Sequence, residues 1–598
     1  MIESGRGGVY AAMLEDKLKL NLRLVRNARY FSLSRFFSFL LFLPAIPMAI
    51  VYNPFWWIPA SLLLAVFIVL VIIHEKSVIR KRFNDNCIAA LTHEKEALNG
   101  QYSSFDGGIE FNDSDHIFTA DLDVFGNDSL FQALNRTATF SGKSRLASWL
   151  KTPLQNRQEI VSRQEAVAEV AEMPEWRIYL RSHGMDAGEE KKDLELLYDW
   201  LVSEPLFTSF FFRIAQTLIP IASFTATSFF ILGIIPAQLF LLYLVIPMAV
   251  TGFHTKAVNR RHVMLSKKVE LLQKYSIRFR MIEDAGFSSE YLTGLVKKLK
   301  SGTLPASSGI QKLGKITASL DTRLNILAGF VLNVYLLWDI RQMRRLEHWQ
   351  KEHRESLPLW FDVLADTESL ASLGSLTYAN PGFVFPDIVT DRFVILAENA
   401  GHPLIPARHR INNYISVTHR RQFNVVTGAN MAGKSTYLRT VGVNMVLALT
   451  GAPVCATSFV CYPAPVYTSL RTTDSLSTNQ SYFYAELLRL KDLIDRLNRG
   501  EELFVLLDEI LKGTNSADKQ AGSKALLTQL IGLGAAGFIA THDLELGKLF
   551  NSFPEDVINY CFEAEIAGEE LHFDYKLKQG IAQNMNATFL MRQMGITL

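Results

Sequence analysis

Four long apolar segments without a charged residue constrain the fold of this chain more than any other feature. They form two pairs: residues 36–52 with 55–73, separated by Asn53-Pro54, and residues 214–232 with 236–252. Each segment has about 17 to 19 residues, close to the ~20 that an α-helix needs to cross a bilayer. The pattern predicts two helical hairpins that span a membrane. The alternative is two hairpins buried inside a large helical domain.

Basic residues flank the outer ends of both pairs. Around the first pair they occur in the stretch 17–29 and at Lys76, Arg80, Lys81 and Arg82, and around the second pair at Arg213, Lys256, Arg260 and Arg261. Positive flanks mark the cytoplasmic side of a membrane protein. We therefore expect a multi-pass protein of the cytoplasmic membrane with its soluble parts in the cytoplasm. The first apolar segment begins too late for a cleavable signal peptide, which predicts a retained anchor.

Composition excludes several other classes of protein. A length of 598 residues suggests about four domains. The net charge of +2 excludes a histone-like protein, and the four cysteines form no C-x-x-C pair that would indicate a zinc ribbon or a disulfide framework. Basic charge is concentrated locally, because residues 253–302 hold 11 Lys or Arg against four Asp or Glu, a net +7. A helix with this charge beside a membrane hairpin is expected to meet anionic lipid headgroups, with a solvated face or nucleic acid as alternatives.

The distribution of apolar, basic and helical or strand-like segments divides the chain into five parts. We expect a basic segment and first hairpin over 1–82, a helical part over 83–205, the second hairpin and a basic helix over 206–302, a second helical part over 303–378, and an α/β domain over 379–598. The weaker apolar run 324–338 contains two asparagines and is too short to cross a bilayer, so we expect a core helix there. The last part alternates short apolar runs, at 393–396, 423–426, 503–507 and 537–540, with helical stretches. Such alternation predicts a mostly parallel sheet.

A glycine-rich motif directly follows the apolar run 423–426. Residues 428–436 read GANMAGKST and fit the pattern G-x-x-x-x-G-K-[ST]. In such a loop the backbone N–H groups close around phosphate oxygens, the lysine supplies charge to the β- and γ-phosphates, and the hydroxyl binds Mg²⁺. Lys434 and Ser435 are expected in these roles. A chance match is the alternative, and the order of strand, loop and helix argues against it.

Two more strand ends carry polar residues of the same chemistry. Asp508 and Glu509 follow the apolar run 503–507, and His542 follows the run 537–540. We expect Asp508 to hold Mg²⁺ and Glu509 to orient or deprotonate the attacking water. His542 is expected to position that water or to sense the γ-phosphate, with a purely structural histidine as the alternative. Lys434, Glu509 and His542 are therefore the predicted catalytic residues, and Ser435 and Asp508 the predicted metal ligands.

These motifs together resemble the MutS mismatch-repair family. Residues 427–439 read TGANMAGKSTYLR and are similar to the family's TGPNMGGKSTYMR, residues 508–514 resemble its DEIGRGT, and residues 540–543 its ATHY. The resemblance implies a P-loop NTPase domain of the MutS and ABC type. It also implies ATP and Mg²⁺ as cofactors, and nucleotide contacts from Gly428, Asn430, Met431, Gly433, Lys434, Ser435 and Thr436.

The resemblance continues upstream and implies partners. Residues 122–125, 134–139, 142–154 and 160–167 are similar to the start of the family's helical lever domain. MutS ATPases are dimers, so a homodimer through the ATPase domain is implied, with Ser481 reaching the partner's γ-phosphate. The second apolar hairpin occupies the region where the family inserts its DNA-gripping clamp. By position, the family's adenine-stacking aromatic corresponds to Arg410, which leaves Arg410 or Tyr414 for that role.

The expected fold is thus an α/β P-loop ATPase domain that follows a mainly helical lever domain with two transmembrane hairpins. The expected function is a membrane-anchored, MutS-like ATPase that acts as a dimeric clamp or lever and binds double-stranded DNA with low sequence specificity, with membrane lipid as a further partner. A mismatch-reading domain is not expected, because the first 100 residues are occupied by the hairpin and its flanks. The alternatives are half of an ABC-type transporter, an ATP-driven remodeller of membrane-associated proteins, and a non-catalytic scaffold.

Overall fold

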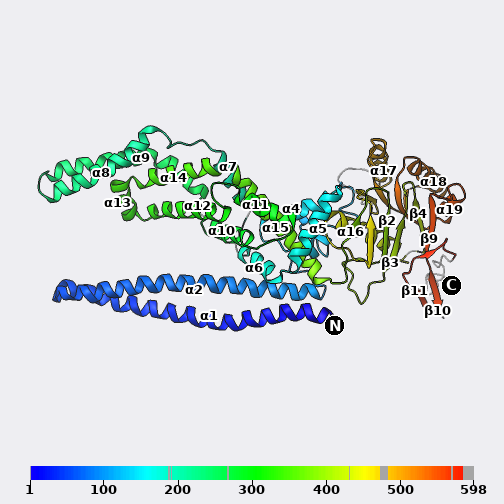
Figure 1. Ribbon diagram of the computed structural model, residues 1–598, viewed down its shortest axis with the longest axis horizontal. Helices are drawn as coiled ribbons and strands as arrows, with labels where there is room; N and C mark the ends of the chain where they lie inside the picture. The colour runs from blue at the N-terminus through cyan, green and yellow to red at the C-terminus, as the bar shows by residue number, and fades with distance from the viewer. Residues whose placement is uncertain are drawn as a thin grey trace.

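A computed structural model describes residues 2–185, 189, 191–265, 269–429, 431–471, 482–512, 514–567 and 570–583. The molecule is elongated (Figure 1). Two helical prongs extend from one end, an α/β domain forms the other end, and a helical region joins them.

The first prong is a long helical hairpin. Helix α1 (Ile2–Pro47) continues into one π-helical turn (Met48–Tyr52), and α2 (Trp57–Leu98) returns beside it. At the turn between them, the Asn53 side chain accepts a hydrogen bond from the Phe55 N–H, and Pro54 opens a short 3-10 turn. These residues end the helix as the sequence predicted. The hairpin is confirmed as a structural element, and its helices extend well beyond the apolar segments.

The second prong contains the other apolar pair. Helices α8 (Phe210–Ile231) and α9 (Ala237–Leu265) form the second predicted hairpin. Its base is held by the buried Glu347, which accepts hydrogen bonds from the N–H groups of Leu206 and Phe207 and pairs with Arg261 at 2.6 Å. A buried carboxylate with three donors fixes where the hairpin leaves the helical region.

Helix α13 (Ile326–Leu336) corrects the expectation of a core helix at residues 324–338. It packs against α8 and α9, and Ile326 and Leu327 are 85% and 79% exposed. Gly329 and Val334 are its buried residues. A short apolar run has no periodicity that separates a core helix from one beside a hairpin, so the sequence could not decide between them.

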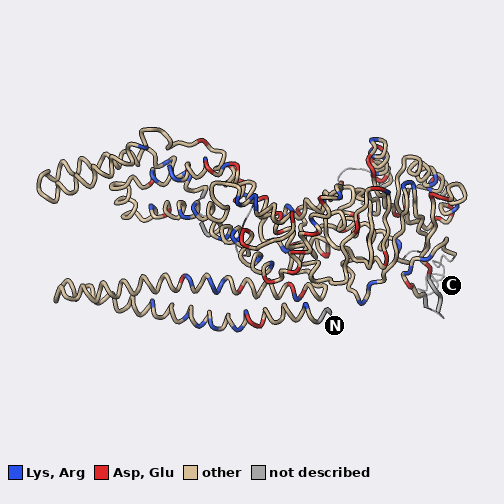
Figure 2. Tube along the Cα trace, in the orientation of Figure 1, with Lys and Arg blue, Asp and Glu red and all other residues tan. Residues whose placement is uncertain are grey.

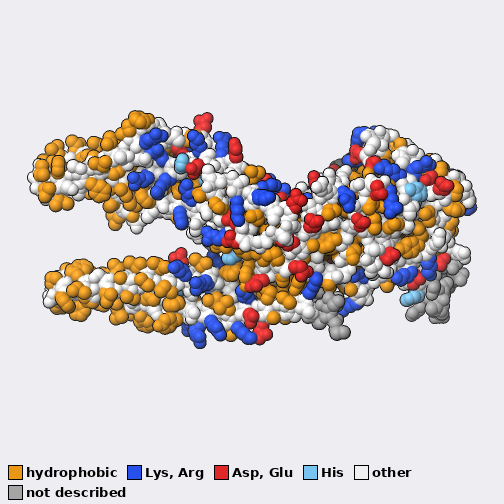
Figure 3. All heavy atoms as spheres, viewed as in Figure 1, with side chains coloured by type: hydrophobic (Ala, Val, Ile, Leu, Met, Phe, Trp, Pro, Cys, Tyr) orange, Lys and Arg blue, Asp and Glu red, His pale blue; other side chains and the backbone are white. Residues whose placement is uncertain are grey.

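Within the part of the chain that the structure describes, four helices are long and apolar enough to cross a membrane, by length and composition alone. They lie in Gly5–Tyr52, Pro54–Leu98, Phe210–Ile231 and Ala237–Met264, and 6 to 17% of their most apolar windows is buried. Both prongs are covered by apolar side chains near their tips (Figure 3), and the charged residues of the tube view begin further back (Figure 2). The two prongs extend in the same direction, so their apolar parts lie at a similar distance from the α/β domain.

The region between prongs and α/β domain is built from helices around the long, buried α15 (Ser356–Ala379). The others are α3 (Leu130–Leu134), α4 (Phe140–Lys151), α5 (Arg157–Ala171), α6 (Pro174–Gly184), α7 (Lys191–Val202), α10 (Val269–Glu283) and α11 (Glu290–Lys300). Helices α12 (Ala306–Asp321) and α14 (Trp338–His353) extend into the second prong, where both pack against α9 (Figure 1). Thr139 and Asn156 cap α4 and α5 with their side chains. Such caps satisfy N–H groups that a helix leaves unpaired at its start.

A buried ionic network ties the first prong to this region. Glu94 of α2 pairs with Arg136 at 2.8 Å, and Glu368 of α15 pairs with Arg278 of α10. Glu368 also accepts hydrogen bonds from the Ala138 N–H and the Thr139 hydroxyl. Each carboxylate therefore has its charge and lone pairs satisfied inside the protein.

The basic region 253–302 is not one helix with a positive face. It covers the end of α9, then α10 and α11, with residues 266–268 outside the described chain. Two of its arginines, Arg261 and Arg278, are buried in ion pairs with Glu347 and Glu368. The sequence could not show these pairs, because the glutamates lie 86 and 90 residues away.

The C-terminal domain contains a six-stranded sheet in the order β12-β9-β4-β8-β7-β6, parallel except for β12. Its strands are β4 (Phe423–Gly428), β6 (Val466–Ser469), β7 (Phe504–Asp508), β8 (Ala536–Thr541), β9 (Val557–Phe562) and β12 (Lys578–Gln579). The helices are α16 (Lys434–Thr450), α17 (Tyr482–Asn498), α18 (Ser516–Gly532) and α19 (Leu544–Gly547). The predicted parallel sheet is confirmed for the runs that became β4, β7 and β8.

The run 393–396 belongs to a second, mixed sheet. This sheet has the order β1-β5-β2-β3 and contains β1 (Asp387–Ile388), β2 (Ile395–Ala400), β3 (Asn413–Val417) and β5 (Ser458–Cys461). Strand β2 is antiparallel to both of its neighbours. A short hairpin of β10 (Ala564–Ala567) and β11 (Glu570–Phe573) completes the domain.

Candidate functional site

The glycine-rich loop connects β4 to α16 in the predicted order. Gly428 has φ +152°, and a Cβ placed on it would lie 2.6 Å from the carbonyl oxygen of Phe562. Gly433 has φ +100° and immediately precedes α16. Both positions need glycine, because a side chain would be strained at these angles and would clash at Gly428. The loop can therefore turn closely over the end of β4 and direct backbone N–H groups towards a ligand.

Lys434 lies at the start of α16 and is 5% exposed. Its Nζ donates hydrogen bonds to the carbonyl oxygens of Gly428 at 2.7 Å and Ala429 at 2.9 Å. Burial lowers the pKa of Lys434, and the charges of Glu509 and Asp508 oppose this shift. The ammonium group is thus held inside the loop, where phosphate oxygens of a ligand can accept its hydrogen bonds.

Asp508 ends β7 at the same sheet edge as the loop. Strands β4, β8 and β7 are parallel neighbours, so their carboxyl ends meet there. Burial raises the pKa of Asp508, while a hydrogen bond with the Ser435 hydroxyl favours the ionised form. Its Oδ1 is buried without a hydrogen-bond partner in the described chain.

Ser435 and Asp508 fit the donor set of a magnesium ion. Both offer hard oxygen atoms, and one carboxylate oxygen is buried and unsatisfied. Within the described residues, no group of three or more His, Cys, Asp or Glu could hold a metal. Mg²⁺ commonly keeps several waters and uses one or two carboxylates together with substrate phosphates, so a small protein donor set suffices.

Glu509 follows in a turn of unusual backbone conformation. It has φ +49°, and its N–H donates to the Ala540 carbonyl at 2.9 Å. His542 Nδ1 lies 3.4 Å from Glu509 Oε1, and Lys512 Nζ lies 3.4 Å from Oε2. Burial alone would raise the pKa of Glu509, but the charges of Lys512, His542 and Lys434 lower it overall. An ionised carboxylate beside the loop is the group required to accept a proton from water.

One cavity of about 450 Å³ brings most of the predicted residues together. It is lined by residues of the loop and the turn, among them Met431, Gly433, Lys434, Ser435, Thr436 and Glu509. Gly428, Asp508 and His542 adjoin these residues through the contacts above. Asn430 and Ser481 lie outside the described residues.

Sequence reasoning missed several other residues that line this cavity. They include Ile411, Phe562 and Tyr575. The Tyr575 carbonyl accepts a hydrogen bond from Asn413 Nδ2 at 3.0 Å, and its ring lies against Gly433. The sequence contained one signal for this contact, an aromatic residue next to a strand near the C-terminus. Only the tertiary contact shows which aromatic side chain reaches the loop.

The two residues considered for adenine stacking have other neighbours. The Arg410 guanidinium lies 5.6 Å from the Phe383 ring, and the Tyr414 ring lies 5.6 Å from Tyr560. Neither Arg410 nor Tyr414 is among the described residues that line the cavity. The ring of Tyr575, which is 44% exposed, lines the cavity.

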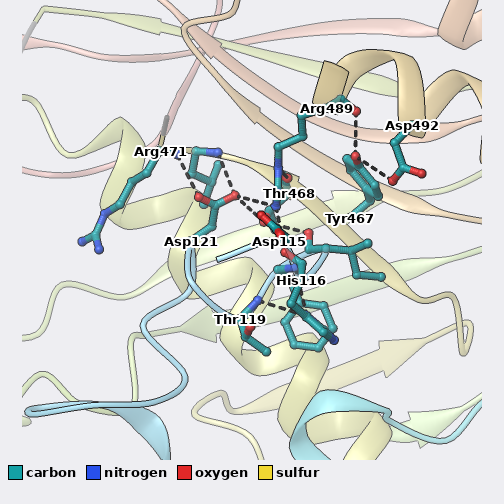
Figure 4. Close-up of polar contacts among 12 residues, drawn as sticks. Asp115, His116, Thr119, Asp121, Tyr467, Thr468, Arg471, Arg489 and Asp492 are labelled. Carbon is teal, nitrogen blue, oxygen red and sulfur yellow. Dashed lines mark hydrogen bonds and ion pairs between the residues drawn. The ribbon is translucent and has the colours of Figure 1, made fainter. Parts of the chain in front are cut away.

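A polar cluster joins the helical region to the α/β domain (Figure 4). Asp121, which precedes α3, is 3% exposed and accepts hydrogen bonds from Thr468 Oγ1 at 2.6 Å and from the N–H groups of Leu470 and Arg471. Arg489 of α17 lies 3.3 Å from the same carboxylate. One buried carboxylate thus joins the end of β6 and helix α17 to a segment about 350 residues earlier in the chain.

The neighbouring Asp123 extends this cluster to α16, the helix that follows the glycine-rich loop. Arg471 binds it with two hydrogen bonds, at 2.6 and 2.9 Å, and Arg439 of α16 lies 3.4 Å away. Arg471 is the last described residue before residues 472–481, which lie outside the described chain. Helix α17 begins directly after these residues. The helical region therefore contacts the helix after the loop and both ends of the segment that contains Ser481.

Two segments of the chain are similar to known protein domains. Residues 114–206 match MutS domain III and residues 424–592 match MutS domain V. The chain is 32% identical over 226 residues to the DNA mismatch repair protein MutS of Aquifex pyrophilus. The aligned region covers 37% of this chain and 26% of that protein. The chain is 30% identical over 237 residues to the protein of the same name from Thermotoga neapolitana, covering 39% of this chain and 29% of that protein.

The chain thus spans less than a third of the length of these two curated relatives. The two matched domains occur in the order III then V, and they include the helices around Asp121 and the strands around Lys434 and Asp508. On these matches, the chain contains two domains of the MutS family, domain III and domain V.

Proposed function

We propose that this chain is a membrane-anchored, MutS-like ATPase that hydrolyses ATP with Mg²⁺. One observation carries the proposal: Lys434, Ser435 and Glu509 line a single cavity of about 450 Å³ at the carboxyl edge of a parallel sheet. Ligands of open α/β sheets bind at this edge. A nucleotide triphosphate explains why a buried ammonium group, a glycine-rich loop and an ionised carboxylate occur in one place.

Each residue has a separate role in this proposal. The loop N–H groups and Lys434 bind the phosphates and stabilise the negative charge of the transition state. Ser435 and Asp508 would hold Mg²⁺, which neutralises charge on the phosphates when it is bound. Glu509 orients the attacking water and accepts its proton, and His542 keeps the Glu509 carboxylate in position.

The adenine is proposed to lie against Tyr575. Its ring lines the cavity next to Gly433 of the phosphate loop, and Ile411 lines the same cavity. A half-exposed aromatic ring beside an aliphatic residue suits a flat base, because stacking needs one open face.

Motion of the helical region is the proposed output. In this proposal two copies join through their ATPase domains, and Ser481 of one copy reaches the nucleotide of the other. The Asp121 and Asp123 contacts connect the loop helix, β6 and α17 to the start of the helical region. Closing and opening of the dimer would therefore move this region.

Double-stranded DNA, bound with low sequence specificity, is the partner we propose first. The matched relatives are named DNA mismatch repair proteins. ATP turnover of the purified full-length chain should rise when duplex, mismatched or branched DNA is added. Turnover that none of the three changes would contradict DNA as the partner.

The ATPase itself is tested by Lys434→Ala in the same assay. The variant should lose turnover and ATP binding, while Lys548→Ala, an exposed lysine of the same domain, should keep both. Equal loss in both variants, or turnover that Lys434→Ala leaves unchanged, would contradict the proposed site.

The four apolar helices are proposed to anchor the protein in the cytoplasmic membrane with the ATPase domain in the cytoplasm. Their length, composition and exposure support this. An engineered Asn53→Cys at the first hairpin tip should react with an impermeant maleimide added outside intact cells. Arg80→Cys should react only after the cells are opened, and the reverse pattern would contradict the orientation.

A further inference from the structure

A small cavity lies where the first prong packs against the helical region. Its volume is about 10 Å³, and none of its lining residues belongs to the nucleotide site. Its wall is formed by α1, α2, α6, α10, α15 and the segment between α3 and α4. We call it the arginine cavity, after four of the residues that line it: Arg136, Arg177, Arg181 and Arg278.

The charges that line the arginine cavity do not balance. Its acidic lining residues, within the described chain, are Glu94 and Glu368. Glu94 pairs with Arg136 at 2.8 Å and lies 3.6 Å from Arg181. Glu368 pairs with Arg278. Two carboxylates thus face four guanidinium groups, so the lining residues carry a net charge of +2.

The surroundings of the cavity do not offset this excess. The side chains of Arg136 and Arg278 are 5% and 1% exposed, and Arg177 is 4% exposed, so water screens them poorly. Glu189 interacts with the charge of Arg278 but does not line the cavity, and burial raises its pKa to about 7. Below that pH its carboxyl is mostly neutral. Buried charge without a counter-charge is costly, so the arginine cavity favours an anion.

Guanidinium donors of the same cluster also lack acceptors. Nη1 of Arg181 and both Nε and Nη1 of Arg278 are buried and have no hydrogen-bond partner in the described chain. Burial lowers the pKa of Arg181 to about 10, and the charge of Glu94 only partly opposes this shift. Buried donors normally have a protein, water or ion partner. Donors without acceptors and an excess of positive charge together indicate an occupant that is negatively charged and accepts hydrogen bonds.

The size of the cavity selects among anions. A volume of about 10 Å³ is close to the smallest that holds one water molecule. Phosphate, sulfate, nucleotides and lipid headgroups are much larger than this. A halide ion is only slightly larger than water. A water molecule would fit as well, but it would leave the charge excess uncompensated.

We propose that the arginine cavity binds one chloride ion, which accepts hydrogen bonds from Arg181 and Arg278 and offsets part of the charge of the four arginines. The ion stabilises the packing of the first prong against α6 and α10, because Tyr10 and Glu94 of that prong line the same cavity. The site is independent of the proposed ATPase and of the proposed membrane insertion.

The proposal predicts that chloride stabilises the folded protein. The purified full-length chain is melted in detergent, at a pH below the pKa of Glu189, while chloride replaces gluconate. The ionic strength stays constant, so that the screening of surface charges does not change. The melting temperature should rise by about 2–4 °C for each tenfold increase in chloride above its dissociation constant, because chloride binds the folded state. Bromide should act like chloride, whereas gluconate is too large for the cavity.

Matched variants separate the arginine cavity from general effects of salt. Arg181→Met removes one charge and the unpartnered Nη1, so the melting temperature should become nearly independent of chloride. Arg181→Lys keeps the charge and should retain part of the rise. Arg163→Met makes the same exchange at a buried arginine that does not line the cavity. It should lower the melting temperature equally in both salts and keep the full rise with chloride.

A direct measurement on the unchanged chain does not depend on the folding of any variant. Crystals grown in bromide should show an anomalous scattering peak within hydrogen-bond distance of Arg181 and Arg278. A cavity without such a peak would overturn the proposal, because water alone would then occupy it. Equal melting temperatures of the unchanged chain in chloride and gluconate would overturn it too. The same holds if chloride stabilises Arg181→Met and Arg163→Met to the same extent.

Discussion

Glu486 of α17 accepts a hydrogen bond from the Leu511 N–H at 2.6 Å, within the turn that presents Glu509. Its second oxygen accepts from the Lys512 N–H at 3.3 Å. Glu486 is 2% exposed, and burial raises its pKa although both N–H groups favour the ionised form. Leu511 and Glu509 both have a positive φ, a backbone angle that residues other than glycine rarely adopt. The helix after the segment 472–481 therefore holds this unusual turn in place.

Glu486→Ala should loosen that turn. Two backbone N–H groups lose their acceptor in a buried place, which costs about 1–3 kcal/mol of unfolding free energy for each group left unsatisfied. We expect a lower melting temperature and slower ATP turnover, measured by thermal melting and by phosphate release. Asp495→Ala on the exposed face of the same helix should change neither. If both variants behave alike, the contact to Leu511 does not position the turn.

Glu509→Gln should abolish steady-state hydrolysis and preserve ATP binding. The amide keeps the shape of the side chain but cannot take a proton, and removal of a general base lowers the rate by about a hundredfold or more. Phosphate release and titration with a fluorescent ATP analogue measure the two properties. Glu545→Gln makes the same exchange at an exposed position and should leave turnover intact. Unchanged turnover in Glu509→Gln would show that another residue handles the water.

Asp121 and Asp123 allow a test of the contact between the helical region and the α/β domain, because one is buried and the other is exposed. Asp121→Asn turns a buried acceptor of several hydrogen bonds into an amide whose NH₂ faces other donors, at a cost of about 1–3 kcal/mol. Asp123 is 43% exposed, so Asp123→Asn should cost less than about 1 kcal/mol. Chemical denaturation in detergent compares the two. Equal destabilisation would contradict the central role of Asp121.

Local sequence patterns were sufficient for the parts of the site that are continuous in the chain. The apolar run before Gly428 and the motif after it predict β4, the loop and α16, because strand, turn glycine and helix start are local preferences. The same holds for Asp508 at the end of β7 and for the hairpin turn at Asn53.

Contacts between distant segments could not be predicted in this way. Asn413 meets Tyr575 across 162 residues, and Asp121 meets Thr468 across 347. No periodicity or motif links such residues, since their contact depends on how the whole domain packs. The buried Arg278 belongs to the same class, because an arginine in a basic stretch has no local sign that a distant glutamate will pair with it.

The buried carboxyl of Glu189 predicts how stability depends on pH. Burial raises the pKa of Glu189 to about 7, and its Oε1 has no hydrogen-bond partner in the described chain, although the Tyr275 hydroxyl donates to its other oxygen. The unfolded chain releases this proton near its ordinary pKa of about 4.3. Between these two values the folded state binds more protons than the unfolded state. This group therefore makes stability fall as pH rises from about 4.3 to about 7.

Glu189→Gln should remove that loss, because a neutral amide has no proton to release and can still accept from the Tyr275 hydroxyl. The variant should melt at a higher temperature than the unchanged chain at pH 8, and the two should converge as the pH falls towards 5. Thermal melting in detergent across this range measures the difference. Glu195→Gln, an exposed residue of α7, should follow the unchanged chain at every pH. A Glu189→Gln variant that is less stable at pH 8 would show that the carboxylate is ionised and paired in the folded protein, because only then would its charge contribute to stability.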